Sequence, residues 1–154
     1  MHRFVGVQAQ EHQPAFAAQA AEEVEHEADV AVLRVARWGR IVNVGSLASK
    51  TGGLTVGTAY SGSKGALAAL TISLARELAE HGVTANAVAP ACVKTPMLTE
   101  QLTEAQRQAL LQQIPVRRFC EPEEFAHVVC FLVSPLSGFI TGEVIDLNGG
   151  LHMD

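Results

Sequence analysis

The chain has 154 residues, which is room for one ordinary domain with a hydrophobic core. Its hydrophobic content of 48% and charged content of 18% exclude a disordered chain, and a net charge of -5 without a basic stripe argues against nucleic acid as a partner. No apolar run approaches the length of a membrane span, and no apolar core with a cleavage site follows the first residues. We therefore expect no membrane insertion, no signal peptide and a cytoplasmic location.

The cysteines and histidines indicate neither a disulfide framework nor a metal site. The three cysteines, Cys92, Cys120 and Cys130, are odd in number and not closely spaced, so we interpret them as reduced thiols. The spacing of the histidines in the first part of the chain matches no metal-ligand motif. These are His2, His12 and His26. We predict no bound metal.

Residues 1–38 are predicted to form an N-terminal helical segment. From Pro14 to Arg37, apolar residues recur at steps of three and four, which places them on one helix face. They are Phe16, Ala20, Val24, Ala28, Ala31 and Val35. Pro14 suits the first turn of such a helix. We expect the main domain to occupy residues 39–154.

A short strand, a polar loop and a long helix follow. Arg40 to Val44 is a β-branched run between two glycines, typical of a strand that is buried on both faces. Residues 45–57 form a glycine-rich loop that lacks the G-x-G-x-x-G spacing of a phosphate-binding turn. Thr58 to His81 is the strongest predicted helix, and Gly82 is a typical residue to end it.

The long helix is apolar around most of its circumference. One apolar face contains Leu67, Leu70, Leu74 and Leu78, and a second contains Ala68, Ile72, Ala75 and Ala79. Small residues near its start would let another backbone approach closely, namely Gly62, Ser63, Gly65, Ala66 and Ala69. Such a helix needs more cover than one sheet gives, so we expect a subunit contact on it. The alternative is a helix that its own chain covers.

The remaining pattern predicts an α/β fold. Two strands and two helices are expected, at Val83–Val88, Thr99–Gln113, Pro122–Val133 and Glu143–Leu147. Strands that alternate with helices indicate a parallel sheet with crossover connections. Ligands bind beyond the carboxyl ends of the strands in such sheets. We therefore expect Ser46, the loop at residues 90–95 and the turn at residues 148–150 to meet at one rim.

Tyr60 and Lys64 carry the chemistry that such a rim would use. They are four residues apart at a helix start, so their side chains lie on one face. An ammonium group beside a phenol stabilises the phenolate, which makes the phenol a usable acid for a carbonyl oxygen or base for an alcohol. Ser46 would donate a hydrogen bond to the same oxygen. This set suits hydride transfer from a cofactor. A surface tyrosine beside a lysine is the alternative for the pair alone.

From Gly39 to Gly150 the sequence resembles the C-terminal half of a short-chain dehydrogenase/reductase. The similar segments follow family order over about three quarters of the chain: GRIVNVGS, YSGSK, GVTANAVAPACVKTPM, PEEFAHVVCFLVS and ITGEVIDLNGG. The last segment is most similar to 3-oxoacyl-acyl-carrier-protein reductases, although many sugar and alcohol dehydrogenases share it. The resemblance implies a partial Rossmann-like, doubly wound parallel sheet of about three strands with flanking helices.

The resemblance also implies a role for individual residues. Ser46 would hold the substrate carbonyl, Tyr60 would be the acid or base, and Lys64 would bind the nicotinamide ribose and tune Tyr60. Three residues match the loop that contacts the nicotinamide end of NAD(P)(H): Pro90, Val93 and Thr95. Residues 96–118 would form the substrate lid. Four of its side chains would line an apolar pocket or simply pack the helix, namely Met97, Leu98, Leu102 and Leu111.

The sequence departs from the family in two places. Residues 1–38 contain one glycine, Gly6, and no asparagine, whereas the family's N-terminal half supplies a glycine-rich pyrophosphate turn, a ribose selector and a catalytic asparagine. That cofactor-binding half is expected to be missing. Ala91 stands where the family usually has glycine, and a Cβ there restricts the backbone. Cys92, beside it, is interpreted as a buried, unreactive thiol.

These features leave three hypotheses. The first is an NAD(P)-dependent oxidoreductase that reduces a carbonyl or oxidises a secondary alcohol, with a 3-oxoacyl thioester as one candidate substrate. It would act as a homo-oligomer on a small molecule. The second is a truncated, inactive remnant or partner subunit that associates with an intact relative through the helix at Thr58–His81. The third is that residues 1–38 reflect a wrong start or reading frame.

Overall fold

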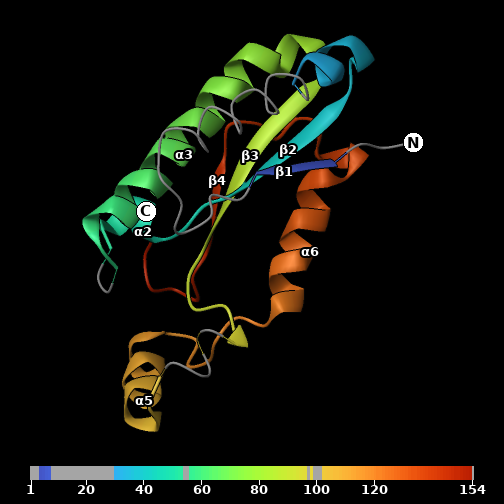
Figure 1. The fold of residues 1–154 in the computed structure, drawn as a ribbon. Helices are drawn as coiled ribbons and strands as arrows, with labels where there is room; N and C mark the ends of the chain where they lie inside the picture. Colours follow the sequence, from blue (N-terminus) through green and yellow to red (C-terminus); the bar gives the residue numbers. More distant parts are fainter. Residues whose placement is uncertain (1–3, 8–29, 54–55, 97, 99–101, 154) are drawn as a thin grey trace.

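A computed structural model describes residues 4–7, 30–53, 56–96, 98 and 102–153. Its centre is a parallel four-stranded sheet in the order β1-β2-β3-β4 (Figure 1). The strands are β1 (Phe4–Val7), β2 (Gly39–Val44), β3 (Val83–Pro90) and β4 (Val144–Leu147). Because all neighbours pair in parallel, every carboxyl end lies at the same edge of the sheet. The predicted α/β fold with a partial Rossmann-like sheet is confirmed.

Helices cover both faces of this sheet. The labelled helices are α2 (Ala48–Thr51), α3 (Thr58–Leu78), α5 (Glu104–Gln113) and α6 (Pro122–Val133), with short 3-10 turns η1 (Ala79–His81) and η2 (Pro135–Ser137). The helix α3 lies on one face and α6 on the other, whereas α5 stands away from the sheet (Figure 1). None of the described helices is long and apolar enough to cross a membrane.

The hydrophobic core has two layers, one on each face of the sheet. Between α3 and the sheet, the buried side chains are Leu33, Ile41, Leu74, Ala75, Leu78, Val83 and Ala85. On the α6 face, Val42, Val88 and Leu132 are buried, with further apolar side chains packed around them. Successive residues of β2 therefore serve opposite layers, as the pleat of a strand requires. This two-sided burial is what the β-branched run predicts.

The helix α3 has a buried side and an exposed side. Its buried positions recur with the helical period, at Ser61, Lys64, Leu67, Thr71, Leu74, Ala75 and Leu78. Leu70 and Ile72 are 41% and 39% exposed. The predicted face that joined Leu70 to Leu67, Leu74 and Leu78 is therefore wrong at Leu70, because Thr71 takes the inward position.

The structure differs from the sequence predictions at three further places. The strand β1 pairs with β2 inside a segment whose residues predict only helix, because four apolar residues give too short a signal for a strand. Of the predicted helix at 14–37, residues 30–36 are helical, and residues 14–29 lie outside the described residues. The short helix α2 lies within the predicted loop at 45–57.

The helix α5 begins later than its apolar pattern predicts. Its first residue is Glu104, because Thr103 caps the helix: the Thr103 side chain accepts a hydrogen bond from the Gln106 backbone, and the Gln106 side chain accepts one from the Thr103 backbone. By contrast, α6 has the predicted bounds, and α3 with η1 spans the predicted helix up to the left-handed Gly82 (φ 71).

Candidate functional site

Hydrogen bonds join the loops at the carboxyl edge of the sheet. Gly45 N donates to Val88 O (2.8 Å) and Leu47 N to Pro90 O (3.1 Å), which ties the loop after β2 to the end of β3. Ala91 N donates to Leu147 O (3.0 Å), which ties β3 to β4. The loops that carry Ser46, residues 90–95 and residues 148–150 thus lie at one rim, as the strand ends predict.

The structure brings Tyr60 and Lys64 together at the start of α3. The Lys64 Nζ lies 5.6 Å from the centroid of the Tyr60 ring. The same Nζ donates to the carbonyl oxygen of Val44 at 3.0 Å. Lys64 is only 6% exposed, and a buried ammonium is stable only where such acceptors surround it. The ammonium is therefore fixed between the phenol ring and the last residue of β2, two residues before Ser46.

A tight contact sets the distance between α2 and α3. Ser61 Oγ on α3 donates to Gly52 O at the end of α2 (2.9 Å). Gly53 has φ +80, and a Cβ at this residue would lie 2.3 Å from Ser61 Oγ. Glycine at this position thus provides both the left-handed turn and the space for the contact. Because Ser46 precedes α2 and Tyr60 follows this turn, the contact positions one relative to the other.

Ser46 is held in the turn that opens α2. Its Oγ accepts from Ala48 N (3.1 Å), and its carbonyl oxygen accepts from Ser49 Oγ (2.7 Å). A serine hydroxyl has one donor besides its acceptor sites, so accepting this bond leaves the Ser46 hydroxyl hydrogen able to point to a carbonyl oxygen. An ion pair between Lys50 Nζ and Asp146 Oδ2 (2.7 Å) ties α2 to β4.

Two parts of this scaffold are not predicted from the sequence. The Val44 carbonyl as a partner of Lys64, and the ion pair of Lys50 with Asp146, depend on the packing of α2 and α3 at the rim. The only sequence signals are that Lys50 lies one helical turn after Ser46 and that Asp146 interrupts an apolar strand. Neither signal reveals a pair whose members are 96 residues apart.

The loop after β3 carries the predicted nicotinamide contacts. Pro90 is the last residue of β3, and Val93 forms an isolated parallel bridge with Cys120. Thr95 Oγ1 accepts from Leu98 N (3.4 Å). The left-handed residue of this loop is Cys92 (φ 53), and Ala91 has no positive φ. Alanine in place of the family's glycine therefore causes no left-handed strain at position 91.

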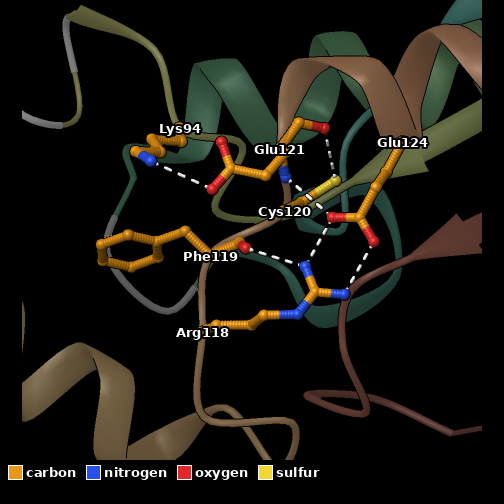
Figure 2. A network of polar contacts seen from close by, with 6 residues as sticks. All are labelled: Lys94, Arg118, Phe119, Cys120, Glu121 and Glu124. Atoms are coloured by element: carbon orange, nitrogen blue, oxygen red, sulfur yellow. Dashed lines mark hydrogen bonds and ion pairs between the residues drawn. The ribbon is translucent and has the colours of Figure 1, made fainter.

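Figure 2 shows a polar network where residues 96–118, the segment that we call the lid, join the rest of the chain. We call this junction the foot of the lid. Arg118 donates to both carboxylate oxygens of Glu124, at 2.5 and 2.7 Å, and to Phe119 O at 3.2 Å. Lys94 Nζ lies 3.0 Å from Glu121 Oε1. The hydrogen bonds from Arg118 lower the pKa of Glu124 to about 2. The two ion pairs, Lys94 with Glu121 and Arg118 with Glu124, thus connect both ends of the lid to the start of α6.

A cavity of about 120 Å³ lies between this network and the strand ends. Its walls include Cys92, Ile114, Arg118, Cys120 and Leu147. Three of the leucines predicted to line a pocket in the lid lie among the described residues, namely Leu98, Leu102 and Leu111. None of the three borders this cavity, and each is half-buried. Met97 lies outside the described residues. Within the described part of the chain, no group of three or more potential ligands could hold a metal ion.

The chain is similar to known proteins over most of its length. A family model described as enoyl-(acyl carrier protein) reductase matches residues 5–152. The chain is 46% identical over 118 residues to the 3-oxoacyl-[acyl-carrier-protein] reductase FabG of Pseudomonas aeruginosa, covering 77% of this chain and 47% of that protein. The protein of the same name from Aquifex aeolicus is 51% identical over 116 residues, covering 75% and 46%.

A third relative has a similar identity and covers a similar share of the chain. The 3-oxoacyl-[acyl-carrier-protein] reductase FabG of Vibrio cholerae is 45% identical over 118 residues, covering 76% of this chain and 47% of that protein. The chain thus spans about half the length of the curated relatives that it matches. The family match begins at residue 5, within β1, and so reaches further towards the N-terminus than the similar segments from Gly39 onwards.

Proposed function

The chain belongs to the short-chain dehydrogenase/reductase family, and we propose that it acts as an NAD(P)(H)-dependent oxidoreductase on a carbonyl or a secondary alcohol. The observation that carries this proposal is the buried Lys64 ammonium, 5.6 Å from the Tyr60 ring and bonded to Val44 O at the end of β2. A 3-oxoacyl thioester is the substrate class that we favour, since the relatives are named as reductases of that class.

The proposed proton transfer uses three side chains of the rim. In the direction of reduction, the Tyr60 hydroxyl gives its proton to the substrate's carbonyl oxygen while Ser46 donates a hydrogen bond to the same oxygen. The Lys64 ammonium stabilises the phenolate that Tyr60 then becomes. In the direction of oxidation, the phenolate takes the proton of the alcohol. A bound nicotinamide cofactor supplies or accepts the hydride.

The chemistry of the rim suits the nicotinamide end of the cofactor. A lysine ammonium beside a phenol hydroxyl is a donor set that matches the two neighbouring hydroxyls of a ribose. We assign this contact to Lys64 and Tyr60. Three residues of the adjoining loop would contact the nicotinamide itself, namely Pro90, Val93 and Thr95. Since Leu47 N and Pro90 O are bonded at 3.1 Å, this loop is held beside Ser46.

Residues 39–154 are assigned to the C-terminal half of the family's domain, with the exposed side of α3 as the contact between copies. Leu70 and Ile72 are exposed on that side, and a Cβ added at Gly62 or Gly65 would meet nothing within 4 Å. Sedimentation velocity tests this: Ile72→Glu should lower the oligomer order. Leu136→Glu replaces an apolar side chain that is even more exposed (96% against 39%) but lies at η2, so it should not. If both variants have the same oligomer order, the proposed contact on α3 is contradicted.

A cofactor titration tests the proposed activity at its first step. The chain is titrated with NADPH and with NADH while cofactor fluorescence or heat is measured. We expect saturable, micromolar binding of at least one cofactor, at least tenfold weaker in Lys64→Ala. The matched control is Arg34→Ala, which removes one positive charge from a surface pair with Glu77. No binding up to millimolar cofactor would contradict the proposal and favour the inactive partner subunit.

A further inference from the structure

A buried polar pair lies within the apolar layer between α3 and the sheet. Asn43 on β2 and Thr71 on α3 are both 0% exposed, and Asn43 Nδ2 donates to Thr71 Oγ1 at 2.9 Å. The Thr71 hydroxyl in turn donates to Leu67 O, one turn earlier in α3, at 2.8 Å. The neighbours of the pair in this layer include the apolar side chains of Ile41 on β2 and Leu74 on α3. The pair therefore adds a directional bond to a contact that is otherwise largely apolar.

Stability alone does not account for this pair. Burying an amide is costly unless its polar atoms are paired, and the Asn43 Oδ1 atom is buried without a partner among the described residues. Two apolar side chains of the same shape would fill this space at least as favourably. What the hydrogen bond adds is direction, because a helix can slide or turn over apolar side chains, whereas this bond has a preferred length and angle. The pair therefore suits the task of fixing one register of α3 on β2.

The same two elements are joined by the bond that holds the Lys64 ammonium. Val44, whose carbonyl oxygen accepts from Lys64 Nζ at 3.0 Å, follows Asn43 directly in β2. Lys64 precedes Thr71 by about two helical turns on the buried side of α3. A shift of α3 by one residue would turn each of its side chains by about 100° around the helix axis and carry Lys64 away from the buried side. The register that Asn43 and Thr71 fix is thus the register that Lys64 needs.

The Lys64 side chain is poorly suited to fix this register by itself. Its ammonium is carried on a flexible four-carbon chain, which lets the Nζ atom reach an acceptor from more than one helix position. Threonine is stiff at its first side-chain torsion and asparagine is short, so a bond between Thr71 and Asn43 tolerates little displacement of the two backbones. The short pair therefore restrains the backbones, and the long Lys64 side chain follows them.

We propose that Asn43 and Thr71 are positioning residues that place the Lys64 ammonium beside Tyr60. They act through the register of α3 on β2, and both are too deeply buried to touch a substrate or a cofactor. In this register the Lys64 Nζ lies 5.6 Å from the centroid of the Tyr60 ring. The catalytic consequence rests on the proposed function, since it matters only if Tyr60 transfers a proton. The placement of Lys64 does not depend on that activity.

Acetylation of the lysines tests the placement without a cofactor or a substrate. The chain has three lysines, and acetic anhydride labels each at a rate that depends on how accessible its amino group is. In the native chain we expect Lys64, which is 6% exposed, to label more slowly than Lys94, whose side chain is 46% exposed. Thr71→Val keeps the shape of the side chain but removes the bond, so labelling of Lys64 should rise about tenfold while that of Lys50 on α2 stays the same. Peptide mass spectrometry measures the three rates.

Two variants control for the substitution itself. Thr71→Ser keeps the hydroxyl and should restore the slow labelling of Lys64. Thr84→Val makes the same exchange at another buried threonine, which is 4% exposed on β3 and whose Oγ1 has no partner among the described residues. No hydrogen bond is lost there, so labelling of Lys64 should stay at the native rate.

A double variant separates register from stability. Asn43→Leu combined with Thr71→Val replaces the polar pair by an apolar one, which should unfold at nearly the native urea concentration. Labelling of Lys64 should nevertheless stay about tenfold faster than in the native chain, because apolar contact does not fix the register. If labelling of Lys64 returns to the native rate in the double variant, the pair contributes only packing and the proposal is contradicted.

Turnover with NADPH and a 3-oxoacyl thioester measures the catalytic consequence. Thr71→Val should lower kcat about tenfold and leave the KM for the thioester unchanged, and Thr71→Ser should recover the native kcat. Equal labelling of Lys64 in Thr71→Val and the native chain would overturn the proposal, and so would an equal rise at Lys50 and Lys64, which indicates general unfolding. A native chain that labels as expected but has no turnover contradicts the proposed function, while its labelling supports the placement of Lys64.

Discussion

The sheet with α3 and the lid that follows β3 are held in different ways. Ile41, Leu78 and Val88 are at most 1% exposed and fix the sheet and α3 from both faces, whereas α5 has no buried residue. The helix α5 stands away from the sheet (Figure 1). The side chains assigned to proton transfer lie on the rigid part, and those that would meet the variable part of a substrate lie on the weakly held part.

The attachments of the two regions differ in kind as well. The body is held by apolar burial, which is insensitive to charge and oxidation. Among its described residues, the lid contributes one buried apolar side chain, Ile114, which is 2% exposed. Its other attachments are polar: the bridge of Val93 with Cys120, a hydrogen bond from Val116 N to Gly149 O (3.2 Å), and two surface ion pairs, Lys94 with Glu121 and Arg118 with Glu124 (Figure 2). Changes in the body should therefore alter global stability, and changes at the foot of the lid should alter mainly the lid.

The largest expected effect is the loss of a core side chain from α3. Leu78 is 0% exposed in the layer between α3 and the sheet. Leu78→Ala should lower the free energy of unfolding by about 2–5 kcal/mol, through lost burial and the cavity left behind. The control is Leu110→Ala in α5, where we expect less than about 1 kcal/mol. Urea unfolding followed by circular dichroism measures both, and equal losses would contradict the contrast between body and lid.

A second prediction compares two glycines of the body. Gly82 has φ +71, and an added Cβ would lie 2.6 Å from Arg37 O, so Gly82→Ala should destabilise by about 1–3 kcal/mol. Gly62 lies within α3, where a Cβ meets nothing within the single chain, so in the dissociated chain Gly62→Ala should stabilise by about 0.5–1 kcal/mol. The same unfolding assay applies, at a protein concentration at which copies do not associate. A Gly62→Ala variant that destabilises the dissociated chain would contradict the prediction.

The third prediction concerns the anchor of α2. Lys50 and Asp146 form a partly buried pair at 2.7 Å, with side chains 22% and 25% exposed. Asp146→Asn should cost about 1 kcal/mol, because it removes the charge of the carboxylate from this partly buried pair. Glu104→Gln, which weakens a surface pair with Arg107 on α5, should cost almost nothing. If both variants unfold at the same urea concentration as the native chain, α2 is not anchored by this pair.

The smallest effect is a pH dependence at the foot of the lid. Because Arg118 depresses the folded-state pKa of Glu124 to about 2, ionised Glu124 stabilises the fold above its unfolded-state pKa near 4.5. This contribution should be lost as pH falls from about 4.5 to about 2. The unfolding midpoint of Glu124→Gln, measured across this range, should therefore fall less steeply than that of the native chain. If the unfolding midpoints of the variant and the native chain fall equally steeply with pH, the depressed pKa of Glu124 is contradicted.

How far the sequence predicts this structure depends on the distance over which each signal acts. Local patterns are sufficient for the bounds of α6 and for the stop at Gly82 of the helical stretch formed by α3 and η1, where capping and glycine chemistry decide. The four-residue strand β1 and the pair of Lys50 with Asp146 are not predicted, because both exist only through contacts between distant segments.

The candidate site shows the same limit. The spacing of Tyr60 and Lys64 predicts that they share a helix face, and the structure places them together. The acceptor of Lys64 and the left-handed backbone of Cys92 arise from packing at the rim and at the foot of the lid. No local pattern in the sequence encodes either of them.

Turnover by the Tyr60→Phe variant tests the central assignment most directly. Native chain, Tyr60→Phe and the surface control Arg34→Ala are each mixed with NADPH and a 3-oxoacyl thioester, and nicotinamide absorbance is followed. If Tyr60 transfers the proton, Tyr60→Phe should lose about 100- to 10,000-fold in rate while still binding NADPH, and the control should keep the native rate. A native chain that turns over at the same rate as Tyr60→Phe would contradict the account.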